Sequence, residues 1–105
     1  MAQFDVHRNT GSQNGALPYL VVVQSRRFDA SRRRVVVPLA LQSAGAGDEP
    51  RLSPTFEIEG KTVVLYPLHL VSIAVDRLGE RVGTLRSEGD RIIGAIDMLI
   101  TRAWD

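Results

Sequence analysis

The chain has 105 residues and a mass of 11.6 kDa, enough for one domain with its own core, spanning residues 1–105. Hydrophobic residues make up 44% and charged residues 24%, so the composition excludes a disordered or fibrous protein. The formal net charge of +1 disfavours a protein that binds nucleic acid by neutralising many phosphates, and we expect no direct sequence-specific binding to nucleic acid.

Cysteine is absent, which excludes disulfides, thiolate nucleophiles and cysteine-ligated metal sites. The longest apolar runs, residues 20–23 and 35–37, are far too short to span a membrane. A secretion signal needs an apolar stretch where this chain has Asp5. These features predict a cytoplasmic protein without a membrane partner.

The first half of the chain predicts three β-strands. Residues 3–8 alternate between apolar and polar side chains, which is typical of a strand. Residues 19–25 are apolar at both alternating positions, which predicts a strand covered on both faces. A turn over residues 26–34 separates it from an apolar strand at 35–41. Because Pro38 cannot donate to a strand ladder, we expect it at a sheet edge or a bulge.

The next part of the chain predicts a hairpin and one further strand. Residues 55–59 and 62–67 flank a Gly-Lys pair and read as two strands joined by a tight turn. Residues 69–75 predict another short strand. Residues 76–86 contain two glycines and predict a turn or a short helical piece.

The C-terminus predicts the only helix. Ser87 is a suitable N-cap residue, and Asp90 three positions later completes a capping-box pattern. Apolar residues then follow at spacings of three and four, which places them on one helical stripe: Ile92, Ile96, Leu99, Ile100 and Ala103. The chain as a whole therefore predicts five or six antiparallel strands followed by one helix.

The sequence lacks the motifs that usually mark a catalytic site. It contains no glycine-rich nucleotide-binding motif and no serine nucleophile motif. His7 and His69 lack the spacing of a helical metal pair, so we expect each to pack or face solvent. The aspartate and glutamate side chains in the loops are expected to be solvated, rather than to form a pair of carboxylates for general acid–base catalysis. The sequence therefore predicts no catalytic residue, no metal and no cofactor, and disfavours an enzyme.

Two features are unusual for a small domain. Residues 26–34 contain five arginines around Phe28, which predicts either a solvated turn or a docking patch with one aromatic anchor. Trp104, the only tryptophan, is the penultimate residue. It is expected either to pack on its own sheet or across a dimer, or to bind a partner.

Four stretches of the chain share a further pattern. They are QFxV at residues 3–6, YLVVVQS at 19–25, RRVVVPL at 33–39 and AIDML at 95–99. In order and spacing, they resemble the CcdB family, toxins of toxin–antitoxin modules that poison DNA gyrase. The resemblance covers nearly the whole chain and is most specific between residues 19 and 39.

The resemblance implies a mainly β fold, a five-stranded antiparallel sheet or SH3-like barrel of the CcdB/MazF toxin type with a C-terminal α-helix. It also implies a homodimer that binds the DNA gyrase A subunit and traps the enzyme in its DNA-cleavage state, by preferential binding of one conformer. A cognate antitoxin, whose disordered C-terminal segment folds on the toxin, would neutralise it.

The family's gyrase contacts lie in the short loop after the VQS strand and at the end of the C-terminal helix. The corresponding positions here are Arg27, Phe28, Asp97, Thr101, Trp104 and Asp105. The family's tryptophan position falls on Thr101, and Trp104 lies three residues later, nearly one helical turn. Trp104 is the predicted main anchor and Phe28 the second, while Leu99 and Ile100 are expected to serve the dimer or the core.

Two other functions stay open at this point. One is a MazF-like endoribonuclease that uses His7 with Arg32–Arg34. The other is a toxin-fold protein that dimerises and binds antitoxin but no longer poisons gyrase. Removing residues 103–105 separates a poison from a nuclease, because a poison would go silent and a nuclease would be largely indifferent.

Overall fold

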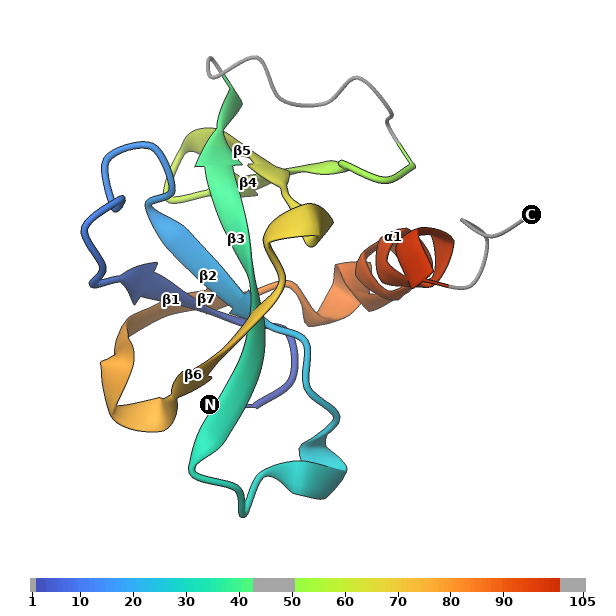
Figure 1. The fold of residues 1–105 in the computed structure, drawn as a ribbon. Coiled ribbons are helices and arrows are strands. Elements are labelled where there is room, and N and C mark those ends of the chain that lie inside the picture. Colours follow the sequence, from blue (N-terminus) through green and yellow to red (C-terminus); the bar gives the residue numbers. More distant parts are fainter. Residues whose placement is uncertain (1, 43–50, 101–105) are drawn as a thin grey trace.

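The computed structural model describes residues 2–42 and 51–100 of the chain. Seven strands form one antiparallel sheet in the order β4-β5-β3-β2-β1-β7, with β6 paired to β3 (Figure 1). The strands are β1 (Asp5–Asn9), β2 (Tyr19–Val22), β3 (Arg33–Leu41), β4 (Thr55–Ile58), β5 (Lys61–Leu65), β6 (Val71–Ala74) and β7 (Leu78–Thr84). The sheet curls into a half-barrel that is followed by helix α1 (Gly89–Ile100). The predicted mainly β fold with a C-terminal helix is confirmed, with seven strands in place of five.

Strand β3 is the centre of the sheet. It pairs with β2 along one side, and on the other side first with β6 over residues 33–36 and then with β5 over 39–41. Pro38 therefore lies in a central strand, and its predicted place at an edge or bulge is wrong. The carbonyl of Pro38 accepts a hydrogen bond from Tyr66 N–H, so its ring nitrogen faces the same side of β3. On that side the pairing with β6 has ended and the pairing with β5 has not begun. The proline is tolerated because no neighbouring strand needs a donor there.

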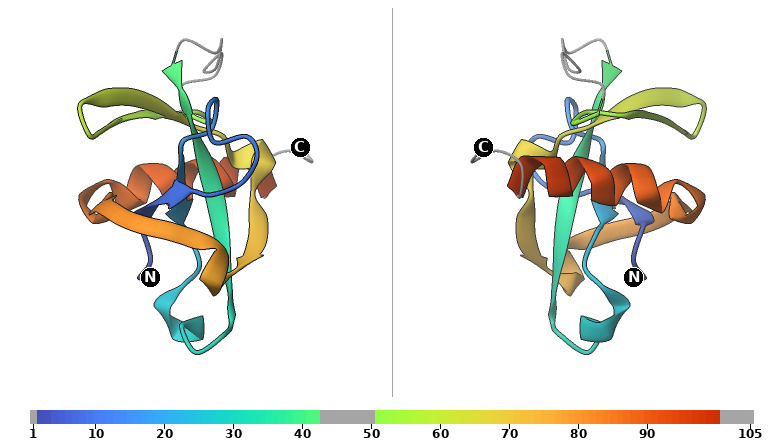
Figure 2. Two further views of the ribbon diagram at one scale, coloured as in Figure 1. Left: turned by 90° about the vertical axis from the view of Figure 1, so that its left-hand side faces the viewer. Right: turned by 90° about the vertical axis from the view of Figure 1, so that its right-hand side faces the viewer.

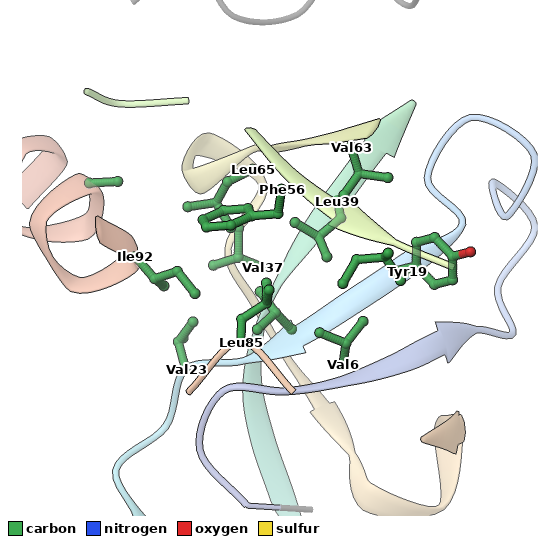
Figure 3. Close-up of a cluster of buried hydrophobic side chains, with 13 residues drawn as sticks. Val6, Tyr19, Val23, Val37, Leu39, Phe56, Val63, Leu65, Leu85 and Ile92 are labelled. Carbon is green, nitrogen blue, oxygen red and sulfur yellow. The ribbon is translucent and has the colours of Figure 1, made fainter. Parts of the chain in front are cut away.

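The main core fills the inside of the curled sheet. Strand β2 is buried on both faces, as predicted: Val21 belongs to the main cluster, while Leu20 and Val22 belong to a smaller cluster on the other side of the sheet. Helix α1 lies against the main cluster, and Figure 2 shows it crossing the open side of the sheet. Ile92 points from the helix into this cluster beside Val37 (Figure 3).

The segment after β6 differs from the prediction. Residues 78–84 form strand β7, which pairs with β1, and only Val75–Arg77 form a short 3₁₀ turn, η4. One of the two glycines in this strand is needed for packing: a Cβ on Gly79 would lie 2.6 Å from the backbone oxygen of Arg8. Glycine therefore marks a close approach of two strands here rather than a turn.

The predicted C-terminal helix is confirmed over Gly89–Ile100, with a different start, and Ala103 of its predicted stripe lies outside the described residues. A 3₁₀ turn, η5 (Arg86–Glu88), leads into it, so Ser87 lies within that turn and the α-helix begins at Gly89. Ile92 is fully buried and Ile100 is exposed, so the apolar stripe of the helix leaves the core towards its C-terminal end. No helix among the described residues is long and apolar enough to cross a membrane.

Candidate functional site

The loop between β2 and β3 begins with a short 3₁₀ turn, η1 (Arg26–Phe28). We call residues 26–34 the arginine loop. Ser25 caps the turn, because its Oγ accepts a hydrogen bond from Arg27 N–H at 3.2 Å and its carbonyl accepts one from Phe28 N–H at 3.0 Å. The cap turns all three residues of η1 outwards, and Phe28 is left 58% exposed.

Arg34 holds the arginine loop from inside. Although it is charged, it is only 6% exposed. Its guanidinium donates to the backbone carbonyls of Ser31 at 2.6 Å, Asp29 at 2.7 Å and Arg33 at 2.9 Å. One of the loop's five arginines thus has a structural role.

Gln24 supports the same loop from the end of β2. Its Nε2 donates to the carbonyls of Phe28 at 3.0 Å and Arg33 at 3.2 Å, and its Oε1 accepts from Val35 N–H at 3.0 Å. This role of Gln24 was not predicted from the sequence. A polar residue directly after an apolar strand was the available signal, because such a side chain can satisfy loop backbone groups.

A shallow groove of about 570 Å³ separates the arginine loop from α1. Its walls come from the segment that follows β2, from η1, β3 and α1, and from the residue that precedes β6, and most of them are apolar. The groove is lined by Val23, Gln24, Ser25, Phe28, Ser31, Val35, Leu70, Ile93 and Ile96. Three of the large apolar side chains, Phe28, Leu70 and Ile93, are substantially exposed. Apolar surface left open in a concave site is typical of a ligand or partner site.

The structure places one segment that the resemblance assigns to gyrase contact, the loop after β2, opposite the middle of α1. Phe28 lines the groove opposite Ile93 and Ile96 of α1, and Arg27 precedes it on η1. Asp97 is exposed on α1 next to Ile96 but does not line the groove. The other predicted contacts lie outside the described residues: Thr101, Trp104 and Asp105.

The histidines do not form the nuclease site that the sequence left open. His7 is only 4% exposed, and its Nδ1 lies 2.9 Å from the carbonyl oxygen of Gly79. A buried strand histidine held in this way cannot act on a substrate together with the arginine loop. His69 is exposed on η3 (Pro67–His69), where its ring lies 5.4 Å from that of Tyr66. Residues 2–42 and 51–100 hold no group of three potential metal ligands.

A second group of charged residues, which we call the Arg8 network, connects strands across the curled sheet. Arg8 in β1 contacts both carboxylate oxygens of Glu59, at 3.0 and 2.7 Å, and its Nε donates to Glu80 at 3.0 Å. Tyr19 donates its hydroxyl to Glu59 at 2.7 Å. Glu59 lies in the β4–β5 turn and Glu80 in β7, so one guanidinium joins three separate parts of the sheet.

The ionisation of this network follows from its contacts. Hydrogen bonds from Tyr19 and Arg8 lower the pKa of Glu59 below its usual value. Burial raises the pKa of the Tyr19 phenol, and the two carboxylates raise the pKa of Arg8. Each charge has an opposite partner within the chain, so the network has no free group for a ligand.

A curled antiparallel sheet followed by a C-terminal helix defines the fold class of this chain. A solved structure described as "Endoribonuclease in complex with its cognate antitoxin from Mycobacterial species" has this fold, with a TM-score of 0.76 and 15% sequence identity, over 100% of this chain and 99% of that chain. Within this class, the chain belongs to the CcdB family: the model of that family, described as CcdB protein, matches residues 3–101. No curated protein matches the sequence.

One prediction from the sequence is contradicted by this comparison. We expected the chain not to be an enzyme, whereas the solved structure that shares its fold over the whole chain is an endoribonuclease. Missing motifs were a poor reason for that expectation. General acid–base chemistry needs groups in the right positions, and such groups can come from distant strands without a recognisable sequence pattern.

Proposed function

We propose that this protein is a toxin that binds the DNA gyrase A subunit and traps the gyrase–DNA cleavage complex. A cognate antitoxin would neutralise it by folding its disordered C-terminal segment on the toxin. The toxin acts by binding one conformer of gyrase more tightly than the others, so that the cleaved state accumulates.

The observation that carries the proposal is the groove between the arginine loop and α1. The CcdB family's gyrase contacts lie in the loop after the VQS strand and at the end of the C-terminal helix, and these segments are far apart in the sequence. Here the loop and the middle of the helix form the two walls of one groove, with Phe28 on one wall and Ile93 and Ile96 on the other. One partner surface can therefore contact both segments at once.

The proposal includes a homodimer. Ile100 is 64% exposed at the end of α1, beyond the part of the helix that packs on the core. Complete burial of this side chain against a second copy of the chain would stabilise the dimer by about 1.5–3 kcal/mol. Light scattering on the purified protein measures the oligomeric state directly, and a monomer at micromolar concentration would contradict this part.

A gyrase cleavage assay tests the main proposal. Purified toxin is added to gyrase, supercoiled plasmid and ATP, and linear DNA is scored after detergent and protease treatment. Phe28→Ala is expected to reduce trapped cleavage at least tenfold, since truncating an aromatic anchor typically costs about 2 kcal/mol or more of binding energy. Leu68→Ala is the matched control, because Leu68 is 73% exposed but does not line the groove. Equal loss in both variants, or no cleavage by the folded wild type, would contradict gyrase poisoning.

Trp104 provides an independent test at the other end of the proposed contact. Trp104→Ala is expected to abolish growth inhibition while leaving a folded toxin, because Trp104 is the predicted main anchor. Unchanged growth inhibition by this variant would remove Trp104 from the contact. A wild type that folds and binds antitoxin but neither inhibits growth nor traps gyrase would be a toxin that has lost its activity.

RNA cleavage is the second candidate function. The observation that favours it is the whole-chain likeness to an endoribonuclease, at 15% identity. The same protein preparation is incubated with total RNA in the presence of a chelator, and the products are mapped by primer extension. Specific cleavage that survives Trp104→Ala would favour the nuclease over the gyrase poison.

A further inference from the structure

The charge of the chain is unevenly distributed. The arginine loop carries five arginines and Asp29, a net charge of +4. The whole chain has a net charge of +1, so the residues outside the loop sum to −3. Although the net charge of the chain is close to zero, the arginine loop is strongly basic, and we call it the basic tip. It lies at the end of β3 away from the β4–β5 hairpin (Figure 1).

Most of this positive charge has no carboxylate partner among residues 2–42 and 51–100. Arg26, Arg27 and Arg32 are exposed, and within the described part of the chain their side chains make no hydrogen bond or ion pair. Arg33 donates only to Ser72, to its Oγ at 2.9 Å and its carbonyl at 2.7 Å, and neither acceptor carries a charge. Elsewhere in the fold, Arg8, Arg81 and Arg91 pair with carboxylates, so the loop differs from these three positions.

The basic tip borders the apolar groove. Arg26 and Arg27 belong to the same 3₁₀ turn as Phe28, whose ring lines the groove. A partner that fills the groove with apolar side chains therefore has its next residues beside unpaired guanidinium groups. Nucleic acid would satisfy the charges but would leave the apolar walls uncovered.

We infer that the groove binds an acidic peptide segment that carries apolar side chains, with its carboxylates on Arg26 and Arg27. The inference rests on the proposed function for the use of this face in partner binding, and it adds the chemistry of the partner. Guanidinium groups pair well with carboxylates, in a bidentate geometry. Charges at the rim of an interface mainly raise the association rate and fix the orientation of the partner, while the apolar contacts keep it bound.

Binding of two synthetic peptides tests the inference. The probe is a fluorescein-labelled peptide with two leucines three positions apart among glutamates, and the comparison peptide has lysine at each glutamate. Fluorescence anisotropy is measured at low and high salt on the full chain. We expect the acidic probe to bind, the lysine peptide not to bind, and high salt to weaken the acidic complex.

Charge-matched variants locate the site. Arg26→Gln with Arg27→Gln is expected to weaken probe binding about tenfold, because two exposed ion pairs are lost. The control is Lys61→Gln with Arg86→Gln, which removes the same charge from residues that do not line the groove. Arg26→Glu with Arg27→Glu is expected to make the protein prefer the lysine peptide.

Three results would overturn the inference. The first is equal affinity of the double-glutamine variant and its control for the acidic probe. The second is binding that does not change when the leucines of the probe are replaced by serine. The third is tighter binding of a short DNA duplex that is lost in the same variants, which would make the tip a phosphate site. Because no gyrase is present, a protein that binds the probe but does not trap gyrase contradicts only the proposed function.

Discussion

The Arg8 network and the arginine loop are both rich in charged side chains, and they differ in where the counter-charges come from. Arg8 has Glu59 and Glu80 within 3.0 Å, and Tyr19 adds a hydrogen bond to Glu59. In the arginine loop, Arg26 and Arg27 are exposed without an ion pair among the described residues. The charges of the Arg8 network have partners within the chain, whereas Arg26 and Arg27 belong to the turn whose Phe28 lines an apolar groove.

This difference separates a structural role from a binding role. A satisfied network such as that of Arg8 gains nothing from a further ligand. When a partner binds at arginines without an ion pair beside exposed apolar side chains, its carboxylates neutralise the arginines and its apolar groups bury the apolar side chains. Arg34 shows that even within the loop one arginine is structural, because its guanidinium is used up on three backbone carbonyls.

Replacing Arg34 is expected to have the largest effect on stability. Arg34→Met keeps the apolar stem but leaves the carbonyls of Ser31, Asp29 and Arg33 without their donor, which should cost about 2 kcal/mol of unfolding free energy. Arg32→Met is the matched control, since Arg32 is exposed and its side chain makes no hydrogen bond within the described part of the chain. Urea denaturation measures both variants, and equal midpoints would show that Arg34 does not hold the loop.

Within the Arg8 network, the Tyr19 hydroxyl is the next test. Tyr19→Phe removes the 2.7 Å hydrogen bond to Glu59 and should lower the unfolding free energy by about 1 kcal/mol. Tyr66→Phe removes a hydroxyl that has no hydrogen bond within the described residues, so it should be close to neutral. Similar losses in the two variants would mean that the Glu59 contact contributes nothing specific.

The pH dependence of stability sharpens the same comparison. The pKa of Glu59 is lowered in the folded protein by hydrogen bonds from Tyr19 and Arg8, from an ordinary value of 4.5. The folded chain therefore binds this proton less readily than the unfolded chain does, so the contribution is fully present above pH 4.5 and is lost as the pH falls through the folded pKa. The stability difference between wild type and Glu59→Gln should shrink on acidification. A difference that is constant with pH would contradict the pairing.

The smallest effect on stability is expected in the arginine loop itself. Arg26→Gln with Arg27→Gln should change the unfolding free energy by less than about 0.5 kcal/mol, because neither side chain has a partner within the described part of the chain. Thermal denaturation checks this value. A clearly larger loss would mean that the two side chains support the fold, and it would remove the basis for assigning them to a partner.

Several features of the fold were predictable from local patterns. Tyr19–Val22 is apolar at every position, and the strand is buried on both faces. The stripe of α1 is spaced for one helical face, and Ile92 is buried in the main core. Periodicity works in these places because it depends only on which face of an element meets the core.

The errors occurred where distant parts of the chain meet. Gly79 reads locally as a turn, but it lies in β7 because the backbone of Arg8 passes too close for a side chain. Pro38 reads as an edge residue, but it lies in β3 at the gap between two partner strands. Both depend on contacts across more than 20 positions of the chain, which no local pattern contains.

The candidate site shows the same division. The sequence placed Phe28 among five arginines and an apolar stripe on the C-terminal helix, and it predicted the CcdB family from stretches in fixed order. Only the tertiary structure decided that Phe28 and the helix share one groove, that Arg34 turns inwards and that Arg26 and Arg27 have no ion pair among the described residues. Side-chain period and composition are local properties, whereas the pairing of a charge depends on which distant residue the fold brings within hydrogen-bonding distance.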